Sequence, residues 1–500
     1  MQRIVLFSIF IIFSTLIYLN KYLQKELSIN RLRLGISIDL TTTLIDPADI
    51  NNLNKAIISD NIYARLISEE NGQLMSWLAD SFRIEKNKII LNLGEHYSSK
   101  GNLITTEDVS LSLKRLILLN TNTHAKLEKF LDIKNVTTLE QLSNVIQINS
   151  KNQITIHTQS KNKANLLLKI LSSGEYGIIP RSAINDKTLK INQNDETSGA
   201  FYLEKTNQVL LKKNKYFKIS NQPEYANEIE VVNIPTSAKA LDEFLQDKID
   251  ILPSSINLNS ANAKKLDQYN IFYTDKFKLF LAAFGPSIYK KTTIHERHYI
   301  IDKMKDLLRD TYPLPVGTEQ ANQFFSLNGD GHLTNQQLED ISNFKKNNEV
   351  TSLNTKIVFQ SYTGLEENMK NLLHFNNLIV KFEDEFPPEQ PYEKRPNSYF
   401  AMGDVSFNTD YTLLSYYLES QIVSLPKNQV NEILNTFLNI ENDAERVKFL
   451  NDIHFKIIKE ANIGPLFLAP YTIVTKKPYI STQTKLSAST KLWKIIVSQQ

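Results

Sequence analysis

Among the residues of this 500-residue chain that could form a metal or catalytic site, the eight histidines come closest to a known motif spacing. Their best pair is His295 and His298, which stand one residue nearer than in the His-Glu-x-x-His motif that brings two imidazoles to one zinc ion. We therefore expect these two histidines, and His96, to be packing or surface residues. The chain also lacks a Gly-x-Ser-x-Gly motif and a glycine-rich phosphate loop. No catalytic residue is predicted, and we expect a protein that is not an enzyme.

A second short pattern, from Ser326 to Leu333, resembles half of a calcium-binding EF-hand loop with Gly331 at its sixth position. Its first position is Ser326 instead of aspartate, and its twelfth is Gln337 instead of the bidentate glutamate. Because the two strongest calcium ligands are missing, we expect a turn that leads into a helix at residues 335–344. The chain has no cysteine, which excludes disulfides, thiolate metal sites and a lipid-modified cysteine. We predict no metal and no cofactor.

Length and charge restrict the class of protein. Five hundred residues exceed what one hydrophobic core supports, so two or more lobes are expected. The apolar fraction of 41% and the charged fraction of 22% are typical of a globular protein. The net charge is only +3, and the basic residues are scattered along the chain. We therefore expect no nucleic-acid partner.

The N-terminus has the pattern of an export signal. Arg3 precedes an uncharged, apolar run over residues 4–19, and Lys21 and Lys25 follow it. Sixteen helical residues span about 24 Å, slightly less than a bilayer's hydrocarbon core. An A-x-A-like cleavage site is missing, which favours an uncleaved membrane anchor over a cleaved signal peptide. We predict that residues 1–30 are one of these two, and that the rest lies in the periplasm or cell envelope, tethered to the inner membrane by residues 4–19 if the leader is an anchor.

Strand and helix patterns alternate after the leader, which predicts an α/β protein with mixed sheets. Residues 32–38 and 154–158 read as strands. Thr105 is placed to cap a helix, with Glu107 and Asp108 in its first turn, where the helix dipole favours negative charge. A long amphipathic helix is expected at residues 443–461, with strands at 277–284, 465–468 and 472–474 on either side in the sequence.

Several weak motifs follow one another in a characteristic order. Between Ser59 and Leu116 an amphipathic segment, a turn, a strand and the Thr105-capped helix succeed each other. This order resembles the N-terminal lobe of the family 5 extracellular solute-binding proteins, the dipeptide- and oligopeptide-binding group that serves ABC transporters. Further motifs that resemble those of the family are Leu44-Ile45-Asp46-Pro47, Ser198-Gly199-Ala200-Phe201-Tyr202, Lys213-Asn214-Lys215-Tyr216-Phe217, Lys248-Ile249-Asp250-Ile251, Glu296-Arg297-His298-Tyr299-Ile300-Ile301 and Gly464-Pro465-Leu466.

The resemblance implies a type II, cluster C-like periplasmic-binding-protein fold, in which two lobes close on a ligand about a hinge. We expect a first lobe at residues 31–275 with a return segment at 471–500, and a second lobe at 276–470. The implied function is that of a substrate-binding protein that delivers a small peptide or other small solute to an ABC permease. We expect the protein to act as a monomer.

The resemblance also points to two ligand-facing segments of the second lobe. They supply the candidate ligand-binding residues Phe284, Gly285, Gly403, Asp404, Phe407, Asn408, Asp410 and Tyr411. Dipeptide-binding members carry a tryptophan and an acidic residue in the second segment. Here the tryptophan is absent, and the position aligned with the ammonium-pairing acid is Phe407, with Asp404 and Asp410 three residues to either side. Recognition of a free dipeptide is therefore not expected.

Two alternatives stay open at this point. The missing lipidation cysteine and the altered second segment favour a membrane-tethered solute receptor or scaffold that keeps the fold without transport. An envelope hydrolase is the other alternative, although the sequence offers no nucleophile–base pair for it. Aromatic residues crowd residues 392–417, where they serve either a binding pocket or the core of the second lobe.

Overall fold

The structure is a computed structural model, and it describes residues 31–70, 73–218, 225–256, 258–312, 314–325, 329–347, 350–353, 356–361, 373–382, 398–405, 409–420, 423–482 and 490–497. The predicted leader, residues 1–30, lies outside these ranges. Within them, no helix has the length and apolar character needed to cross a bilayer.

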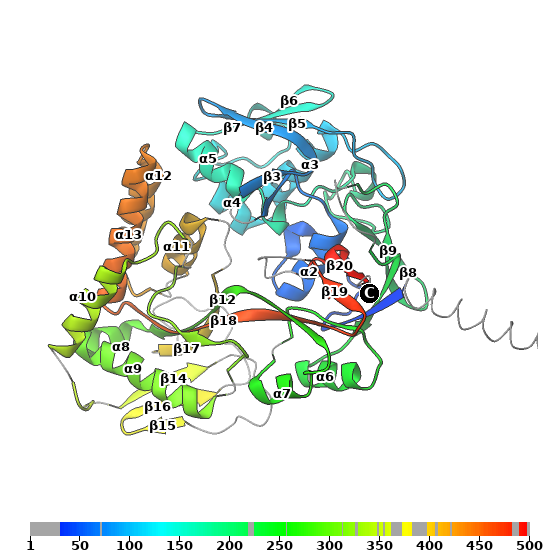
Figure 1. The fold of residues 1–500 in the computed structure, drawn as a ribbon. Helices are drawn as coiled ribbons and strands as arrows, with labels where there is room; N and C mark the ends of the chain where they lie inside the picture. Colours follow the sequence, from blue (N-terminus) through cyan, green and yellow to red (C-terminus); the bar gives the residue numbers. More distant parts are fainter. Residues whose placement is uncertain are drawn as a thin grey trace, which may run out of the picture.

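A mixed twelve-stranded sheet among the described residues extends through the molecule (Figure 1). Its strands follow the order β15-β16-β14-β17-β12-β18-β11-β1-β10-β9-β8, with β13 paired to β18. The bounds are β1 Arg31–Ile36, β8 Phe201–Lys205, β9 Val209–Lys213, β10 Glu228–Asn233, β11 Ile251–Leu252, β12 Asn270–Phe284, β13 Glu319–Gln320, β14 Ile357–Ser361, β15 Leu373–Phe375, β16 Leu378–Phe382, β17 Ser398–Asp404 and β18 Ile463–Thr475.

The two longest strands, β12 and β18, lie side by side at the centre of this sheet and run antiparallel. Their register shifts between Phe280 and Leu281, and it shifts twice between Tyr273 and Lys278, opposite Pro470, which has no N–H to donate to the ladder. We call the elements on the β1 side of this irregularity the first lobe and those on the β17 side the second lobe. The strands predicted at 465–468 and 472–474 are confirmed as strand residues, but they are parts of one strand, because β18 continues through Pro470.

The first lobe adds a four-stranded antiparallel sheet and several helices to its share of the central sheet (Figure 1, top). Its small sheet has the order β4-β5-β7-β6. The bounds are α2 Leu53–Ile62, β2 Ile67–Glu70, β3 Gln73–Ser76, β4 Ala79–Glu85, β5 Lys88–Leu93, α3 Thr106–Leu119, α4 Thr121–Leu127, β6 Ile146–Ser150, β7 Gln153–His157, α5 Lys161–Ile170, α6 Ser237–Leu245, α7 Ser260–Lys264, β19 Tyr479–Ser481 and β20 Ile495–Val497, with short 3-10 helices at Pro47–Asp49, Gln141–Asn144, Gly174–Tyr176, Arg181–Ala183 and Leu492–Lys494.

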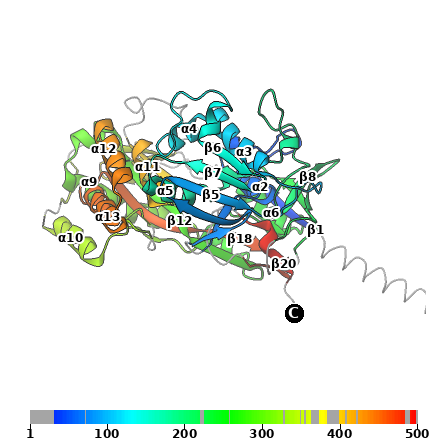
Figure 2. The ribbon, with the colours of Figure 1, turned by 90° about the horizontal axis from the view of Figure 1, so that it is seen from above.

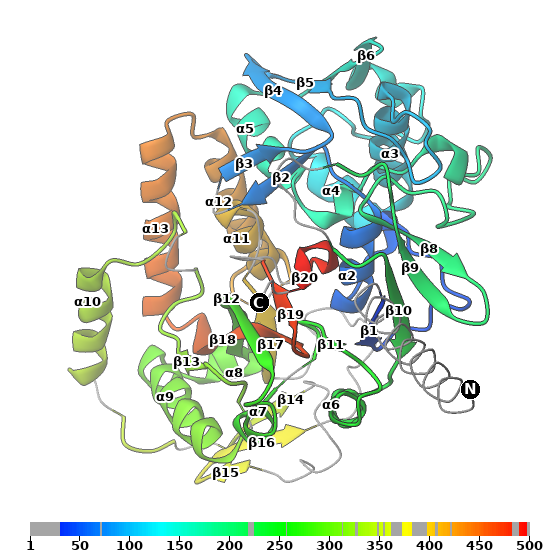
Figure 3. The same ribbon diagram turned by 45° about the vertical axis from the view of Figure 1, so that its right-hand side comes forward.

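The second lobe packs helices against the other end of the central sheet. Ile301 and Met304 of α9 belong to the same buried cluster as Phe280 of β12 and Leu466 of β18. Helices α11, α12 and α13 stand together beside this core (Figure 3). The bounds are α8 Pro286–Lys291, α9 Ile294–Thr311, α10 Asn335–Lys346, α11 Asp410–Glu419, α12 Lys427–Asn439 and α13 Asp443–Lys459.

The predicted Thr105 cap and the predicted start of the long helix are both present. The Thr105 hydroxyl accepts from the Asp108 N–H, and the Asp108 carboxylate accepts from the Thr105 N–H at 2.7 Å, which is a complete capping box at the start of α3. Helix α13 begins at Asp443, as predicted, and is capped by Asn442. Each cap satisfies backbone donors that a helix start leaves unpaired.

Several residues of the family-like motifs hold separate parts of the chain together. Asp46 of the Leu-Ile-Asp-Pro motif forms two hydrogen bonds, at 3.0 and 2.6 Å, with the buried guanidinium of Arg115 on α3. Asp250 likewise accepts two hydrogen bonds, each of 2.9 Å, from the guanidinium of Arg33 on β1. Gly199 lies so close to α2 that a Cβ atom there would stand 2.5 Å from a backbone carbon of Ile62. These motif residues therefore stabilise the folded arrangement of the chain.

Arg297 has the same kind of role in the second lobe. This residue is 3% exposed, and its guanidinium donates to the carbonyl oxygens of Thr292 at 2.8 Å, Glu460 at 2.9 Å and Ala461 at 3.1 Å. It also lies over the Tyr289 ring, 4.1 Å from the centroid. One arginine on α9 thus satisfies the C-terminal carbonyl groups that follow α8 and α13.

We predict that Arg297→Met lowers the free energy of unfolding by about 3 kcal/mol, because it leaves buried carbonyl oxygens without donors. Chemical denaturation followed by fluorescence measures this change. Arg309→Met is the matched control, since Arg309 lies on the same helix but pairs with Asp306 at the surface. Equal shifts for the two variants would contradict the structural role of Arg297.

Candidate functional site

The two lobes meet at the N-terminal end of α5 in the first lobe and the corner between α12 and α13 in the second (Figure 2). Asn162 is 5% exposed, and its amide donates to the carbonyl oxygens of Leu438 at 3.2 Å and Ile440 at 2.9 Å. Its side-chain oxygen accepts from Arg446. All three partners belong to the second lobe, so Asn162 fastens one lobe to the other.

An aromatic and an ionic contact continue this interface towards α11. The Phe130 ring, which follows α4, meets the Tyr411 ring edge-on at 5.7 Å. Tyr411 also stacks on Phe437 of α12 at 5.2 Å. Lys129 forms an ion pair with Glu419 at the end of α11. The lobes are therefore in direct contact through apolar and charged side chains.

Asp410 is a partly buried carboxylate at this interface. It occupies the first position of α11, after the Thr409 cap, and accepts the Gly331 N–H at 2.6 Å. Burial raises the pKa of Asp410 to about 6, and attraction to Lys169 of α5 acts in the opposite direction. Burial also raises the pKa of Glu69 on β2, again opposed by attraction to Lys169. A first-lobe cation thus faces one acid from each lobe.

The loop that resembled a calcium site is held by protein groups where it is described. Gly331 gives its N–H to Asp410, and its carbonyl oxygen lies 2.7 Å from Nδ1 of the fully buried His454. Burial lowers the pKa of His454 to about 3, so the ring is neutral at physiological pH. Ser326 lies outside the described residues, among which no group of three metal-binding side chains occurs.

The other predicted site residues lie elsewhere. The Phe284 ring is 1% exposed and packs on Phe359 at 5.8 Å, while Gly285 caps α8 and donates to the Ser398 hydroxyl at 3.3 Å. A Cβ atom at Gly403 would stand 2.5 Å from the Tyr417 hydroxyl oxygen. These contacts are inside the second lobe, so all three residues have packing roles that the resemblance did not predict.

Three predicted residues are described in part or not at all. The backbone of Asp404 is the register partner of Lys278 on β12, near the irregular centre of the long strands. Phe407 and Asn408 lie outside the described residues. Of the eight candidates, the structure brings Asp410 and Tyr411 to the interface between the lobes.

The sequence did not indicate the remaining interface residues, Asn162, Phe130, Lys129 and Glu419. Each comes from a helix or its flank, and its contact across the interface joins residues 276 to 290 positions apart in the sequence. Their local sequences differ in no visible way from those of an exposed helix end. Only the folded arrangement identifies them.

We predict that the free energy of unfolding of the wild type falls relative to Asp410→Asn by about 2–3 kcal/mol between pH 4 and pH 7. The folded pKa of Asp410 is raised to about 6 from 3.8, so its stabilising effect is complete below pH 3.8 and is lost as the pH rises through 6. Asparagine keeps the acceptor for Gly331 and does not titrate. Denaturation at several pH values measures the difference.

Asp452→Asn is the control, since Asp452 is an exposed acid paired with Lys448 on α13. Its difference from the wild type is expected to stay flat. The titration of His454 is common to all variants and cancels in the comparison. A flat difference for Asp410→Asn would contradict the burial of its carboxylate.

Comparison with known proteins yields structural matches alone. No protein-family model matches the chain, and no curated sequence matches it significantly. Among solved structures, NikA from Brucella suis in complex with Fe(III)-EDTA matches with a TM-score of 0.69 at 14% identity, covering 93% of this chain and 100% of NikA. The Escherichia coli murein tripeptide binding protein MppA matches with a TM-score of 0.68 at 14% identity, covering 94% and 99%.

A third match is the ABC transporter-associated periplasmic binding protein DppA from Helicobacter pylori in complex with the peptide STSA. Its TM-score is 0.66 at 14% identity, and the match covers 93% of this chain and 98% of DppA. All three superpose over nearly their whole length, which confirms the predicted fold class. The chain therefore has the two-lobed fold of the periplasmic binding proteins of ABC transporters, the family 5 solute-binding proteins that its sequence resembles.

Proposed function

We propose that this chain is an envelope substrate-binding protein of an ABC importer, which binds a peptide or other small solute between its lobes and presents it to a permease in the inner membrane. The observation that supports this most strongly is the match to periplasmic binding proteins over 93% or more of the chain. The matched proteins are described with ligands as different as Fe(III)-EDTA, a murein tripeptide and the peptide STSA. The fold therefore supports the mode of binding without choosing the ligand.

The proposed mechanism is closure of the lobes on the ligand. The lobes are joined by β12 and β18, whose register is irregular where they pass from one lobe to the other. A ligand that touches both lobes stabilises the closed arrangement by its differential affinity for that state.

The test is native mass spectrometry of the full chain, purified gently from the envelope of its own host. We expect a co-purifying peptide or small molecule, which should be lost on unfolding and should rebind on refolding with a rise in Tm. An empty protein that shows no thermal shift with peptides, sugars or metal chelates would contradict the proposal.

We also predict that Asn162→Ala favours an open arrangement of the lobes. The change removes three hydrogen bonds between the lobes, each worth about 1 kcal/mol. The closed state should therefore weaken about 100-fold relative to the open state, which small-angle X-ray scattering detects as a larger radius of gyration.

Asn92→Ala is the matched control, because Asn92 makes its side-chain hydrogen bonds to Ser81 and Gln153 within the first lobe. It should leave the scattering curve unchanged. If Asn162→Ala also left it unchanged, while melting at the wild-type temperature, the role of Asn162 in holding the lobes together would be wrong.

A further inference from the structure

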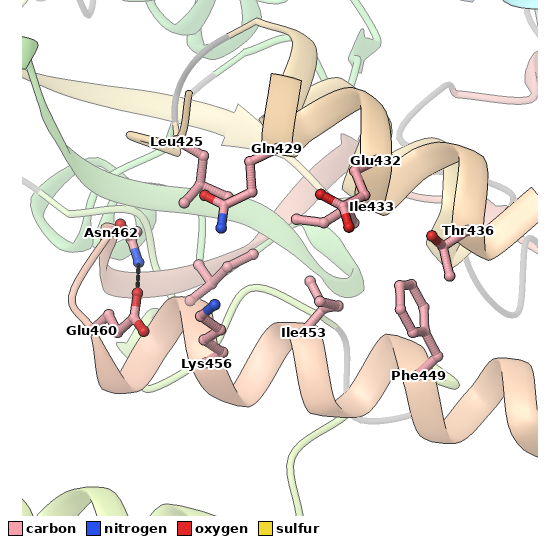
Figure 4. A pocket seen from close by; sticks show the side chains of 11 residues that line it. Leu425, Gln429, Glu432, Ile433, Thr436, Phe449, Ile453, Lys456, Glu460 and Asn462 are labelled. Atoms are coloured by element: carbon pink, nitrogen blue, oxygen red, sulfur yellow. Dashed lines mark hydrogen bonds between the residues drawn. The ribbon is translucent and has the colours of Figure 1, made fainter. Parts of the chain in front are cut away.

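A groove of about 210 Å³ lies between α12 and α13 in the second lobe (Figure 4). It is distinct from the interface between the lobes, since its lining includes no residue of the first lobe. The apolar part of the lining is Leu425, Ile433, Phe449, Ile453 and Ile457. Phe449 and Ile453 are only half-buried, so apolar surface faces the groove.

Polar groups collect towards one end of the groove. Lys456 points into it from α13 near Gln429, Glu432 points into it from α12 further along, and Phe449 and Thr436 occupy the other end (Figure 4). The groove closes at Asn462, which is fully buried. Its amide donates to Glu460 at 3.2 Å, and its oxygen accepts from Tyr289 at 2.5 Å. The polar end is therefore built on a fixed side chain.

Three charged residues line the groove, and two of them, the exposed Glu432 and Lys456, have no protein counterpart among the described residues. Within the described part of the chain, neither Glu432 nor Lys456 forms an ion pair or a side-chain hydrogen bond. Their charges are opposite, and they come from different helices. A ligand head that carries both a carboxylate and an ammonium would complement them, with the carboxylate at Lys456 and the ammonium at Glu432.

The volume of the groove limits the size of the ligand. Pockets for drug-sized molecules occupy about 300–1,000 Å³, so a 210 Å³ groove accepts a smaller molecule. Its apolar floor begins beside the charged groups and continues to Phe449. This arrangement fits a small zwitterionic head followed by a single apolar side chain.

We propose that the groove between α12 and α13 is a second binding site, and that its ligand is a free α-amino acid with an aliphatic side chain. The site goes beyond the proposed function, because it uses neither the interface between the lobes nor the hinge strands. Occupancy of the groove would stabilise the packing of α12 on α13, two helices that carry the corner contacted by Asn162.

The test is saturation-transfer NMR and calorimetry of the full chain with L-leucine. We expect leucine to bind, and its two matched analogues, 4-methylpentanoate without the ammonium and 3-methylbutylamine without the carboxylate, to bind at least tenfold more weakly. Absence of leucine binding at about 10 mM would overturn the proposal, and so would equal binding of all three compounds, which indicates non-specific apolar contact.

Variants locate the site. Lys456→Met and Glu432→Gln should each weaken leucine binding at least tenfold, and Ile453→Trp should abolish it by filling the groove. Lys448→Met is the control, since Lys448 lies on the same helix, is exposed and pairs with Asp452 outside the groove. Leucine binding that survives Ile453→Trp would place the ligand elsewhere, including between the lobes, and overturn the proposal.

The same variants distinguish other occupants. If sedimentation showed a wild-type dimer that Ile453→Trp converts to a monomer, the groove would be an interface between copies, and the amino-acid site would be wrong. The outcome is also separate from the proposed function. A ligand found between the lobes by mass spectrometry persists in the groove variants, whereas failure of that search leaves leucine binding to the groove unaffected.

Discussion

The antiparallel pairing of β12 with β18 is the contact on which the rest of this structure depends. The strands of the first lobe reach the central sheet through β11, which pairs with β18, and those of the second reach it through β17, which pairs with β12. The backbone hydrogen bonds of one strand pair therefore hold two groups of elements in a single sheet. The register of the pair shifts twice between Tyr273 and Lys278, where the strands pass from one lobe to the other, and once more between Phe280 and Leu281.

The family-like motifs serve this framework. The Arg33–Asp250 pair joins β1 to the segment before β11. The Arg115–Asp46 pair joins α3 to the residue before the 3-10 helix Pro47–Asp49. Arg297 donates hydrogen bonds to carbonyl groups at the ends of two helices. Buried charges and close glycine contacts tolerate few replacements, since each change leaves an unpaired group or a clash. A resemblance built on such residues predicts the outline of the fold and gives little information about a ligand.

The sequence accordingly predicted the elements better than the site. The Thr105 cap, the helix at Asp443 and the alternation at residues 154–158 are local patterns, and the structure confirms them. Asp410 and Tyr411 do lie where the lobes meet, but Phe284 points into a core that its neighbours in sequence cannot reveal. Asn162 escaped prediction because its three partners come from the second lobe, far along the chain. Long-range side-chain contacts depend on how the lobes pack, and no local pattern records that packing.

The irregular register at the centre of β12 and β18 has a mechanical consequence. Helix α5, which carries Asn162, and the adjoining ends of α12 and α13 are set apart from these strands (Figure 1). In the proposed closure, a small rotation at the strand centre would therefore become a larger displacement at these helices. Loss of the Asn162 hydrogen bonds would allow that displacement, while the residues at the strand centre would change their backbone angles only slightly. The free-energy cost of opening would then lie mainly in the contacts between the lobes, and the strand pair would keep its hydrogen bonds.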